Sequence, residues 1–387
     1  MSALPDLALS ERVLELAIAI QRIPAPTFCE GRRAVFIHER FQAEGLSDVS
    51  MDMAGNVYGR LPGAGSQPPL VVSAHLDSVF PEDTPLDCRR EAETIYGPGI
   101  GDNALGVAGL FGLLWMVRGD ASLRLRPNLS GRKAKPSPAL PGDVWLVANV
   151  AEEGMGNLRG MTAVVDRFNS AVSAYLVLEG MALGQVYHRG LNVRRYQIKV
   201  STAGGHSWVD YGQPSAIHEL AGLITRLCAL PLPSQPRTSL NVGVISGGTT
   251  VNSIAAQADC LLDLRSEGDE SIAYVASQVE GLVEAGNRSG VQLSWELAGT
   301  RPAGELPQDH PLVKLAVSCL EAQGIQPLLN IGSTDANLPL SRGLPAICIG
   351  LTSGGGAHTT GEYIHTLPLL QGLGQLLTLV EGAFEGW

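Results

Sequence analysis

Residues 144–153 read Val-Trp-Leu-Val-Ala-Asn-Val-Ala-Glu-Glu, an apolar run that ends on two adjacent acids. The run predicts a buried strand of an α/β protein, and two carboxylates beside such a strand are costly unless a cation neutralises them. Adjacent side chains point in different directions, so we expect Glu152 and Glu153 to differ in role. One acid can bind a metal while the other accepts a proton from water and returns it to a leaving nitrogen. The alternative is a solvated loop with two surface acids.

Four more side chains that can bind a metal follow apolar runs or glycine-rich loops: His75, Asp102, Glu179 and His358. Side chains at the carboxyl ends of strands in an open α/β sheet meet in one crevice. The order of these residues therefore predicts a single metal site. A carboxylate such as Asp102 has two oxygens and can bridge cations roughly 3.5–4 Å apart, so the site has ligands enough for two ions.

His75 and Asp77 form a His-x-Asp triplet. Residues two apart in an extended stretch share a face, so we expect the Asp77 side chain to accept a hydrogen bond from the imidazole of His75. That bond would leave the other ring nitrogen free for a metal. We expect Glu362, four residues after His358, to orient that histidine in the same way. Taken singly, each residue is equally compatible with an ordinary loop histidine or edge carboxylate.

Composition narrows the class of protein. The 387 residues are enough for two domains with separate cores, and 45% of them are hydrophobic. The net charge of −11 argues against a nucleic-acid partner, because phosphate contacts need clustered lysine and arginine. We expect no membrane span and no secretory signal. Six scattered cysteines without a Cys-x-x-Cys pair predict reduced thiols in a cytoplasmic protein.

The order of predicted elements indicates one domain interrupted by another. Residues 1–187 and 303–387 alternate apolar strands with helices and predict an α/β domain that binds the metals. Residues 188–302 instead predict the order β-α-β-β-α-β, which is the ferredoxin-like arrangement. The segment 119–142 is rich in Arg, Lys, Ser and Pro and is expected to be a surface excursion.

Local signals predict two helix starts in the first domain. Ser10 is the expected N-cap of a helix over 11–23, and Asp309 is the expected N-cap of a helix over 310–323.

Other chemistries find less support in the sequence. Residues 99–104 read Gly-Ile-Gly-Asp-Asn-Ala and fit the glycine pattern of a dinucleotide site, which would suit an NAD-dependent dehydrogenase. Such a site needs a strand directly before the glycines, but residues 89–93 are mostly charged. The chain contains no Gly-x-Ser-x-Gly elbow and no P-loop, so serine and phosphate-binding mechanisms are disfavoured.

Together these residues resemble the co-catalytic zinc family that includes peptidase T, glutamate carboxypeptidase, aminoacylase-1, acetylornithine deacetylase and succinyl-diaminopimelate desuccinylase. The likeness covers nearly the whole chain, and it implies a zinc-exopeptidase-type mixed sheet flanked by helices. The motifs that carry it are Ile23-Pro-Ala-Pro26, Asp52-Met-Ala-Gly-Asn-Val57, His75-Leu-Asp77, Gly101-Asp102, Glu152-Glu153-Gly154, Leu178-Glu179-Gly180, Gly332-Ser-Thr-Asp335 and the His358 loop.

The resemblance implies five ligands to two zinc ions, or to cobalt or manganese in their place: His75, Asp102, Glu153, Glu179 and His358. His75 and Glu179 would hold one ion, and Glu153 and His358 the other. Asp102 would bridge the two.

For catalysis, the resemblance implies Glu152 as general acid and base, with Asp77 in support of His75. It also implies a cis peptide between Asp102 and Asn103.

The inserted domain, 188–302, resembles the lid and dimerisation domain of that family. His206, in Gly205-His206-Ser207, would stabilise the oxyanion of the reaction. Asn252 and Arg265 would bind the carboxylate end of the substrate, a task that suits the planar fork of arginine. Without the resemblance, these three residues could be a loop histidine, a turn asparagine and a strand-end arginine.

We therefore expect a cytoplasmic homodimeric hydrolase that cleaves an amide bond of a small peptide or an N-acyl amino acid. Glu179 stands where aminopeptidase-like relatives often carry Asp, which favours the carboxypeptidase and deacylase branch. An aminotripeptidase like peptidase T is the alternative within the family. A metal-dependent binding protein without catalysis is the alternative outside the enzymes.

Overall fold

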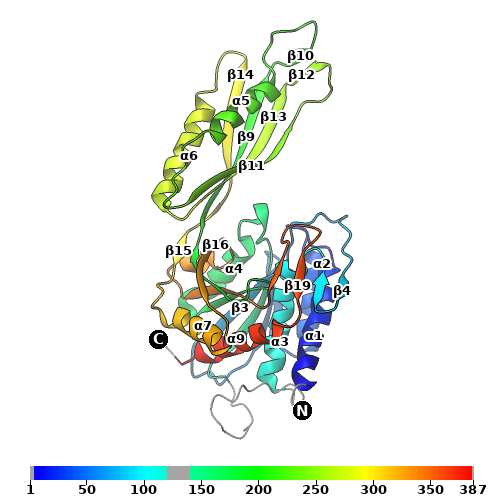
Figure 1. Cartoon of the computed structure of the whole chain (residues 1–387), viewed down its shortest axis with the longest axis vertical. Helices are drawn as coiled ribbons and strands as arrows, with labels where there is room; N and C mark the ends of the chain where they lie inside the picture. The colour runs from blue at the N-terminus through cyan, green and yellow to red at the C-terminus, as the bar shows by residue number, and fades with distance from the viewer. Residues whose placement is uncertain (1–3, 120–139, 386–387) are drawn as a thin grey trace. The chain divides into compact units, whose positions relative to one another are not determined.

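The computed structural model describes residues 4–119 and 140–385, which form two compact units (Figure 1). The first unit contains the chain up to Gly190 and again from Gly304, and the second unit is the insert Leu191–Ala303. The expected surface excursion at 119–142 falls largely outside the described residues. All six cysteines are free thiols.

A mixed sheet forms the centre of the first unit. Its strands are β1 (Ser47–Met51), β2 (Val57–Leu61), β3 (Leu70–His75), β6 (Val144–Asn149), β7 (Tyr175–Glu179), β8 (Gln185–Gly190), β15 (Gly304–Glu305), β16 (Leu328–Gly332) and β17 (Ala346–Gly350). The strand order is β1-β2-β6-β3-β7-β17-β8-β15, with β16 paired to β8. The four strands β6, β3, β7 and β17 are parallel and almost wholly buried, which explains why they are continuous apolar runs in the sequence. The predicted mixed α/β fold is confirmed.

Helices pack on this sheet: α1 (Leu4–Gln21), α2 (Gly31–Ala43), α3 (Leu105–Arg118), α4 (Arg159–Phe168), α7 (Pro311–Ala322), α8 (Asn337–Ser341) and α9 (Leu369–Gly382). The most apolar is α3, which packs against α1, α9 and β3. Together with the turn before it, α3 forms a stretch, Ile100–Arg118, that is long and apolar enough to cross a membrane by length and composition. That corrects the expectation that no run reaches this length. However, 89% of its most apolar window is buried inside the fold, as in a core helix.

Two predicted helix starts are wrong. α1 begins at Leu4, so Ser10 is a buried residue inside the helix rather than its N-cap. α7 is capped by His310, whose Nδ1 accepts the backbone N–H of Leu312 at 3.1 Å, and Asp309 lies one residue too early. α1 extends further toward the N-terminus than expected, whereas for α7 two neighbouring residues can both cap the helix and the sequence pattern does not distinguish them.

The second unit has the predicted β-α-β-β-α-β order, and this part of the expected fold is confirmed. Its main elements are β9 (Asn192–Thr202), α5 (Ala216–Cys228), β11 (Thr238–Gly247), β13 (Gln257–Ser266), α6 (Asp269–Glu284) and β14 (Val291–Arg301). The four strands form an antiparallel sheet in the order β11-β13-β9-β14. Both helices cover the same face of that sheet, where Leu223 of α5 and Val279 of α6 join Ile198 of β9 in one core (Figure 1).

The insert leaves and re-enters the first unit at one place. β8 ends at Gly190 and β15 begins at Gly304, and these two glycines are opposite each other in an antiparallel pair. Inside the insert, the first and last strands are also neighbours, with Val193 opposite Arg301.

A tight turn before α3 carries Asp102. Residues 100–104 form a single π-helical turn, η1 (Ile100–Ala104), in which Asp102 and Asn103 have non-helical backbone angles. The peptide between them is cis, as the resemblance implied. The buried Asn103 side chain donates to the carbonyl of Leu178 (2.8 Å) and accepts the N–H of Gly180 (2.9 Å). The turn is therefore attached to the end of β7.

We expect the substitution Gly106→Ala to destabilise the protein. A Cβ at Gly106 would overlap the Asn103 side chain that ties the turn to β7, and overpacking of this kind costs about 1–3 kcal/mol. Thermal unfolding measures the effect. Gly222→Ala in α5 is the matched control, because its Cβ would meet nothing within 4 Å and alanine favours a helix by up to about 1 kcal/mol. Equal melting temperatures for the two variants would contradict this account of the turn.

Candidate metal centre

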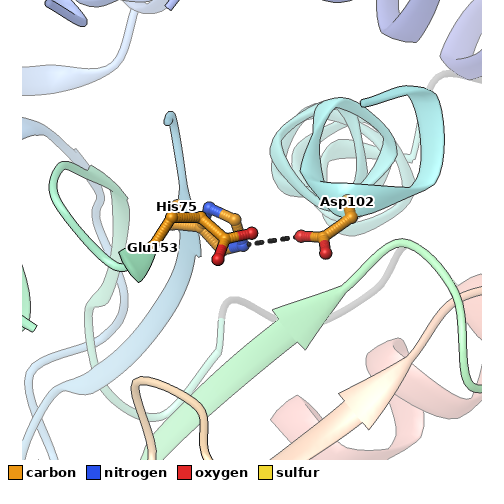
Figure 2. A group of neighbouring side chains, drawn as sticks. All are labelled: His75, Asp102 and Glu153. Atoms are coloured by element: carbon orange, nitrogen blue, oxygen red, sulfur yellow. Dashed lines mark ion pairs between the residues drawn. The ribbon is translucent and has the colours of Figure 1, made fainter. Parts of the chain in front are cut away.

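The five side chains expected to bind metal lie together at the carboxyl ends of the central strands. Three of them, His75, Asp102 and Glu153, place a ligand atom each within 4.8 Å of one another (Figure 2). His75 ends β3, Glu179 ends β7, and Asp102 comes from the turn before α3. Parallel neighbouring strands bring these ends to one edge of the sheet, as their order in the sequence predicted.

Asp102 lies at the middle of the group. Its Oδ1 is 3.1 Å from Nε2 of His75, and its Oδ2 is 3.2 Å from Nε2 of His358. The outer acids complete two half-sites. Nε2 of His75 is 3.7 Å from Oε2 of Glu179, and Nε2 of His358 is 3.2 Å from Oε1 of Glu153. One carboxylate with an oxygen in each half-site is the arrangement that a bridging ligand needs.

The acids of this group are buried, and burial disfavours their charged forms. Burial raises the pKa of Glu153 to about 7, and burial likewise raises the pKa of Glu179 to about 7. Hydrogen bonds to Asp102 and Glu153 raise the pKa of His358 to about 10. Burial alone would lower the pKa of His75, but its carboxylate neighbours hold it well above its usual value. Positive charge is strongly favoured at both histidines.

The donor set fits a pair of divalent cations. Each half-site offers one imidazole nitrogen, one glutamate and one oxygen of Asp102. Nitrogen and carboxylate donors are those that zinc takes in catalytic sites with an open position. A cation in each half-site would provide the positive charge that the carboxylates require.

Asp77 contacts His75 as expected, but more closely through its backbone than through its side chain. Nδ1 of His75 makes its hydrogen bond with the backbone oxygen of Asp77 at 3.1 Å, whereas the Asp77 carboxylate is 3.5 Å away. The carboxylate instead accepts the backbone N–H groups of Glu152 (3.0 Å) and Glu153 (2.9 Å) and the hydroxyl of Thr27 (2.9 Å). The backbone oxygen of Asp77 thus binds Nδ1 of His75 and leaves Nε2 available for a metal. The Asp77 side chain holds the backbone of the two glutamates in place.

Glu362 also differs from the expectation. Its carboxylate accepts the backbone N–H groups of Gly99 (2.9 Å), Gly101 (2.7 Å) and Asp102 (2.8 Å), and so holds the bridging acid rather than His358. Burial raises the pKa of Glu362 to about 7. A sequence does not show which backbone groups a carboxylate will bind. The position of Glu362 near His358 therefore could not predict this role.

Two further residues hold the loop before Glu152, and sequence reasoning assigned them no role. The Asn56 side-chain oxygen accepts the N–H of Val150 (3.0 Å), and Glu30 accepts the N–H of Ala151 (3.0 Å). Ala151 has a positive φ of 56°, an uncommon conformation for a residue with a Cβ. Asn56 lies inside the motif Asp52–Val57, and its place in that motif could have indicated a role near the site.

In the second unit, His206 and Asn252 lie side by side. His206 ends β10 (Gly205–His206), which pairs with β12 (Ser253–Ile254), and the N–H of Ser207 donates to the backbone oxygen of Asn252 (3.0 Å). Nδ1 of His206 accepts the backbone N–H groups of Trp208 (3.2 Å) and Val209 (3.3 Å). In a neutral ring this leaves the proton on Nε2, as a free donor on an exposed side chain.

Arg265 lies at the other end of the same unit. It is near the end of β13, opposite Val193, whereas the loop with Asn252 precedes the start of that strand at Gln257. Arg265 lies eight positions after Gln257 along this extended strand, or roughly 26 Å away at about 3.3 Å per residue. The Arg265 guanidinium binds the neighbouring Asp263 through Nε at 2.7 Å. Within one chain, this unit therefore does not bring together the two residues expected to bind one substrate carboxylate.

Two models of known protein families match the chain. Peptidase family M28 matches residues 56–192, and the peptidase dimerisation domain (M20_dimer) matches residues 191–291. The chain is a peptidase-type hydrolase of amide bonds. The resemblance seen in its sequence is confirmed, and the match to peptidase models argues against a binding protein without catalysis. No curated protein sequence matches this hydrolase significantly.

Solved structures with the same fold cover nearly all of the hydrolase. The aminopeptidase PepT from Bacillus cereus is 19% identical with a TM-score of 0.71, over 97% of this chain and 98% of that one. The dipeptidase Dug1p from Saccharomyces cerevisiae is 13% identical with a TM-score of 0.77, over 99% and 98%. A dinuclear metal-binding peptidase from Bacillus subtilis is 17% identical with a TM-score of 0.62, over 98% and 100%.

We expect Glu362→Gln to weaken metal binding by about 10–100-fold, the usual effect of removing a partner that orients a ligand. The glutamine side chain has one acceptor oxygen, and its NH₂ group would face backbone N–H groups that the carboxylate of Glu362 now accepts. The turn that carries Asp102 would therefore lose hydrogen bonds. Metal titration of chelator-treated protein measures this. Glu39→Gln on the exposed side of α2 is the control and should bind metal like the unaltered chain. Equal affinity in both variants would contradict the role of Glu362.

Proposed function

We propose that this hydrolase uses two zinc ions to cleave the amide bond of a small peptide or an N-acyl amino acid. The observation that carries the proposal is the position of Asp102, with one oxygen toward His75 and the other toward His358. Zinc would be held by His75, Glu179 and Asp102 in one half-site, and by His358, Glu153 and Asp102 in the other. Cobalt or manganese could take the same donors.

When bound, zinc would lower the pKa of a water to about 7 and polarise the carbonyl of the substrate. We assign proton transfer to Glu152, because its neighbour Glu153 faces His358 and adjacent side chains point in different directions. Its backbone is fixed by Asp77. Glu152 would take a proton from the attacking water and give it to the departing nitrogen.

His206 would donate a hydrogen bond to the oxyanion through Nε2. The support is its hydrogen-bonding pattern, since backbone N–H groups occupy Nδ1 and require the proton on the other nitrogen. A neutral donor aimed at developing negative charge is the usual form of such stabilisation.

We propose that the enzyme works as a homodimer in the cytoplasm. The match of the insert to a peptidase dimerisation domain supports the dimer. The separation of Asn252 from Arg265 along β13 also supports the dimer. A site that uses both residues would need Asn252 from one chain and Arg265 from another. Sedimentation of the purified chain would test this.

For the substrate we favour an N-acyl amino acid or a C-terminal residue. Arg265 could bind the free carboxylate of such a substrate, and Glu179 in place of aspartate is the pattern of the deacylase and carboxypeptidase branch. The alternative is an aminotripeptidase, which the likeness to the aminopeptidase PepT supports.

We expect Glu152→Gln to keep both metal ions but lose about 10²–10⁴-fold in kcat, the usual contribution of a general acid and base. Metal content and turnover of a hydrolysable N-acyl amino acid or dipeptide measure the two effects. Glu153→Gln is the matched contrast and should lose metal as well. Near-normal turnover of Glu152→Gln would overturn the assigned role.

We expect Glu179→Asp to shift preference by about tenfold toward substrates with a free amino end, a difference of the size that pocket contacts produce. A panel of dipeptides, tripeptides and N-acetyl amino acids measures kcat/KM for the original and altered enzymes. The same panel separates the deacylase from the aminotripeptidase in the unaltered enzyme. An unchanged preference would remove Glu179 as a determinant of specificity.

A further inference from the structure

Asp335 and Asn149 form a buried contact at the base of the loop that carries Glu152. Asn149 is the last residue of β6, and Asp335 lies between β16 and α8. Both side chains are 0% exposed. Nδ2 of Asn149 donates to Oδ2 of Asp335 at 2.7 Å. The contact therefore joins the start of the Glu152 loop to a segment nearly two hundred residues later in the chain.

One oxygen of each side chain has no partner among the described residues. These atoms are Oδ1 of Asn149 and Oδ1 of Asp335. An ionised Asp335 can only accept hydrogen bonds, so it would leave both buried acceptors without a donor. Buried polar atoms in native proteins are nearly always paired. A single proton on Oδ1 of Asp335 would satisfy both atoms, because the O–H could donate to Oδ1 of Asn149.

Burial and the nearby acids Glu152 and Asp77 favour that proton, whereas the charge of His75 opposes it. Glu152 follows β6, His75 and Asp77 lie at the end of β3, and the buried thiol of Cys348 lies on β17. Burial, followed by the charge of Glu152, raises the pKa of Asp335 to about 8. Proteins can keep a carboxylic acid neutral at pH 7 in this way, so that it donates a hydrogen bond.

We propose that Asp335 is a positioning residue, kept as a neutral carboxylic acid and joined to Asn149 by two hydrogen bonds. The pair fixes the start of the Glu152 loop without placing another negative charge beside Glu152. Ionisation would break one of the two bonds and add that charge. The consequence for catalysis rests on the proposed function of Glu152, whereas the protonation state does not.

The matched variants are Asp335→Asn and Asp335→Ala, made in the full chain. An asparagine at 335 can form the same pair of hydrogen bonds with Asn149 and cannot ionise. We expect Asp335→Asn to keep kcat/KM at pH 7 within about threefold, and Asp335→Ala to lose about tenfold or more because Asn149 is left unpaired. The kcat of the original enzyme should fall at alkaline pH as Asp335 ionises, and that of Asp335→Asn should fall less.

Thermal stability gives a test that needs no substrate. The folded pKa of Asp335 is above its unfolded value, so its contribution to stability is complete at low pH and is lost as the pH rises through about 8. The melting temperature of the original protein should therefore fall more steeply between pH 7 and 9 than that of Asp335→Asn. The infrared difference between these two proteins should show a neutral carboxyl band at low pH that disappears across the same interval.

A fully folded Asp335→Asn that is as inactive as Asp335→Ala would overturn the proposal, since an ionised carboxylate would then be the functional form. Equal pH dependence of melting with no infrared difference band would also overturn it, and would indicate an ionised Asp335 paired with a buried water. If the original enzyme hydrolyses no amide in the panel, the proposed function fails. The melting and infrared results would still decide the state of Asp335.

Discussion

The contact of Asp102 with two histidines is the constraint around which the first unit is arranged. Its two oxygens face His75 and His358, and Glu179 and Glu153 lie against the same two rings. Carboxylates removed from water need positive charge close by. Protons on the histidines can supply part of that charge, and divalent cations supply it more completely. The sheet contributes the geometry, since parallel strands deliver these groups to one edge.

A second set of buried acids faces the backbone rather than the centre. Asp77 receives the N–H groups of the Glu152–Glu153 loop, Glu362 receives those of the Asp102 turn, and Glu30 receives that of Ala151. Loops have no partner strand for their N–H groups, so a buried loop needs side-chain acceptors. The acidic residues near the site thus divide into those that face the half-sites and those that hold the loops still. Precision at the centre depends on the second group as much as on the first.

The sequence predicted those parts of the molecule that depend on local patterns. The apolar run at 346–350 is the strand β17 itself, and the alternation of elements in the insert predicted its β-α-β-β-α-β order. The side chains that lie together at the candidate metal centre were predicted because each follows a strand or glycine loop. What the sequence missed depends on long-range partners: the acceptors Glu30 and Glu362, and the side-chain oxygen of Asn56. A sequence does not show which backbone N–H groups need a side-chain acceptor. The helix starts at Leu4 and Pro311 were missed because Ser10 and Asp309 also fit a capping pattern.

The place where the insert departs has a consequence for how the molecule is built. Gly190 and Gly304 are paired across β8 and β15, as the last residues of a hairpin would be. A two-residue reverse turn could close that hairpin, so the larger unit does not need the 113 residues of Leu191–Ala303 to complete its sheet. The smaller unit has its own core and adjacent ends on β9 and β14. The architecture is that of a complete α/β domain that carries a second module, with a hydrophobic core of its own, at the position of a single β-turn.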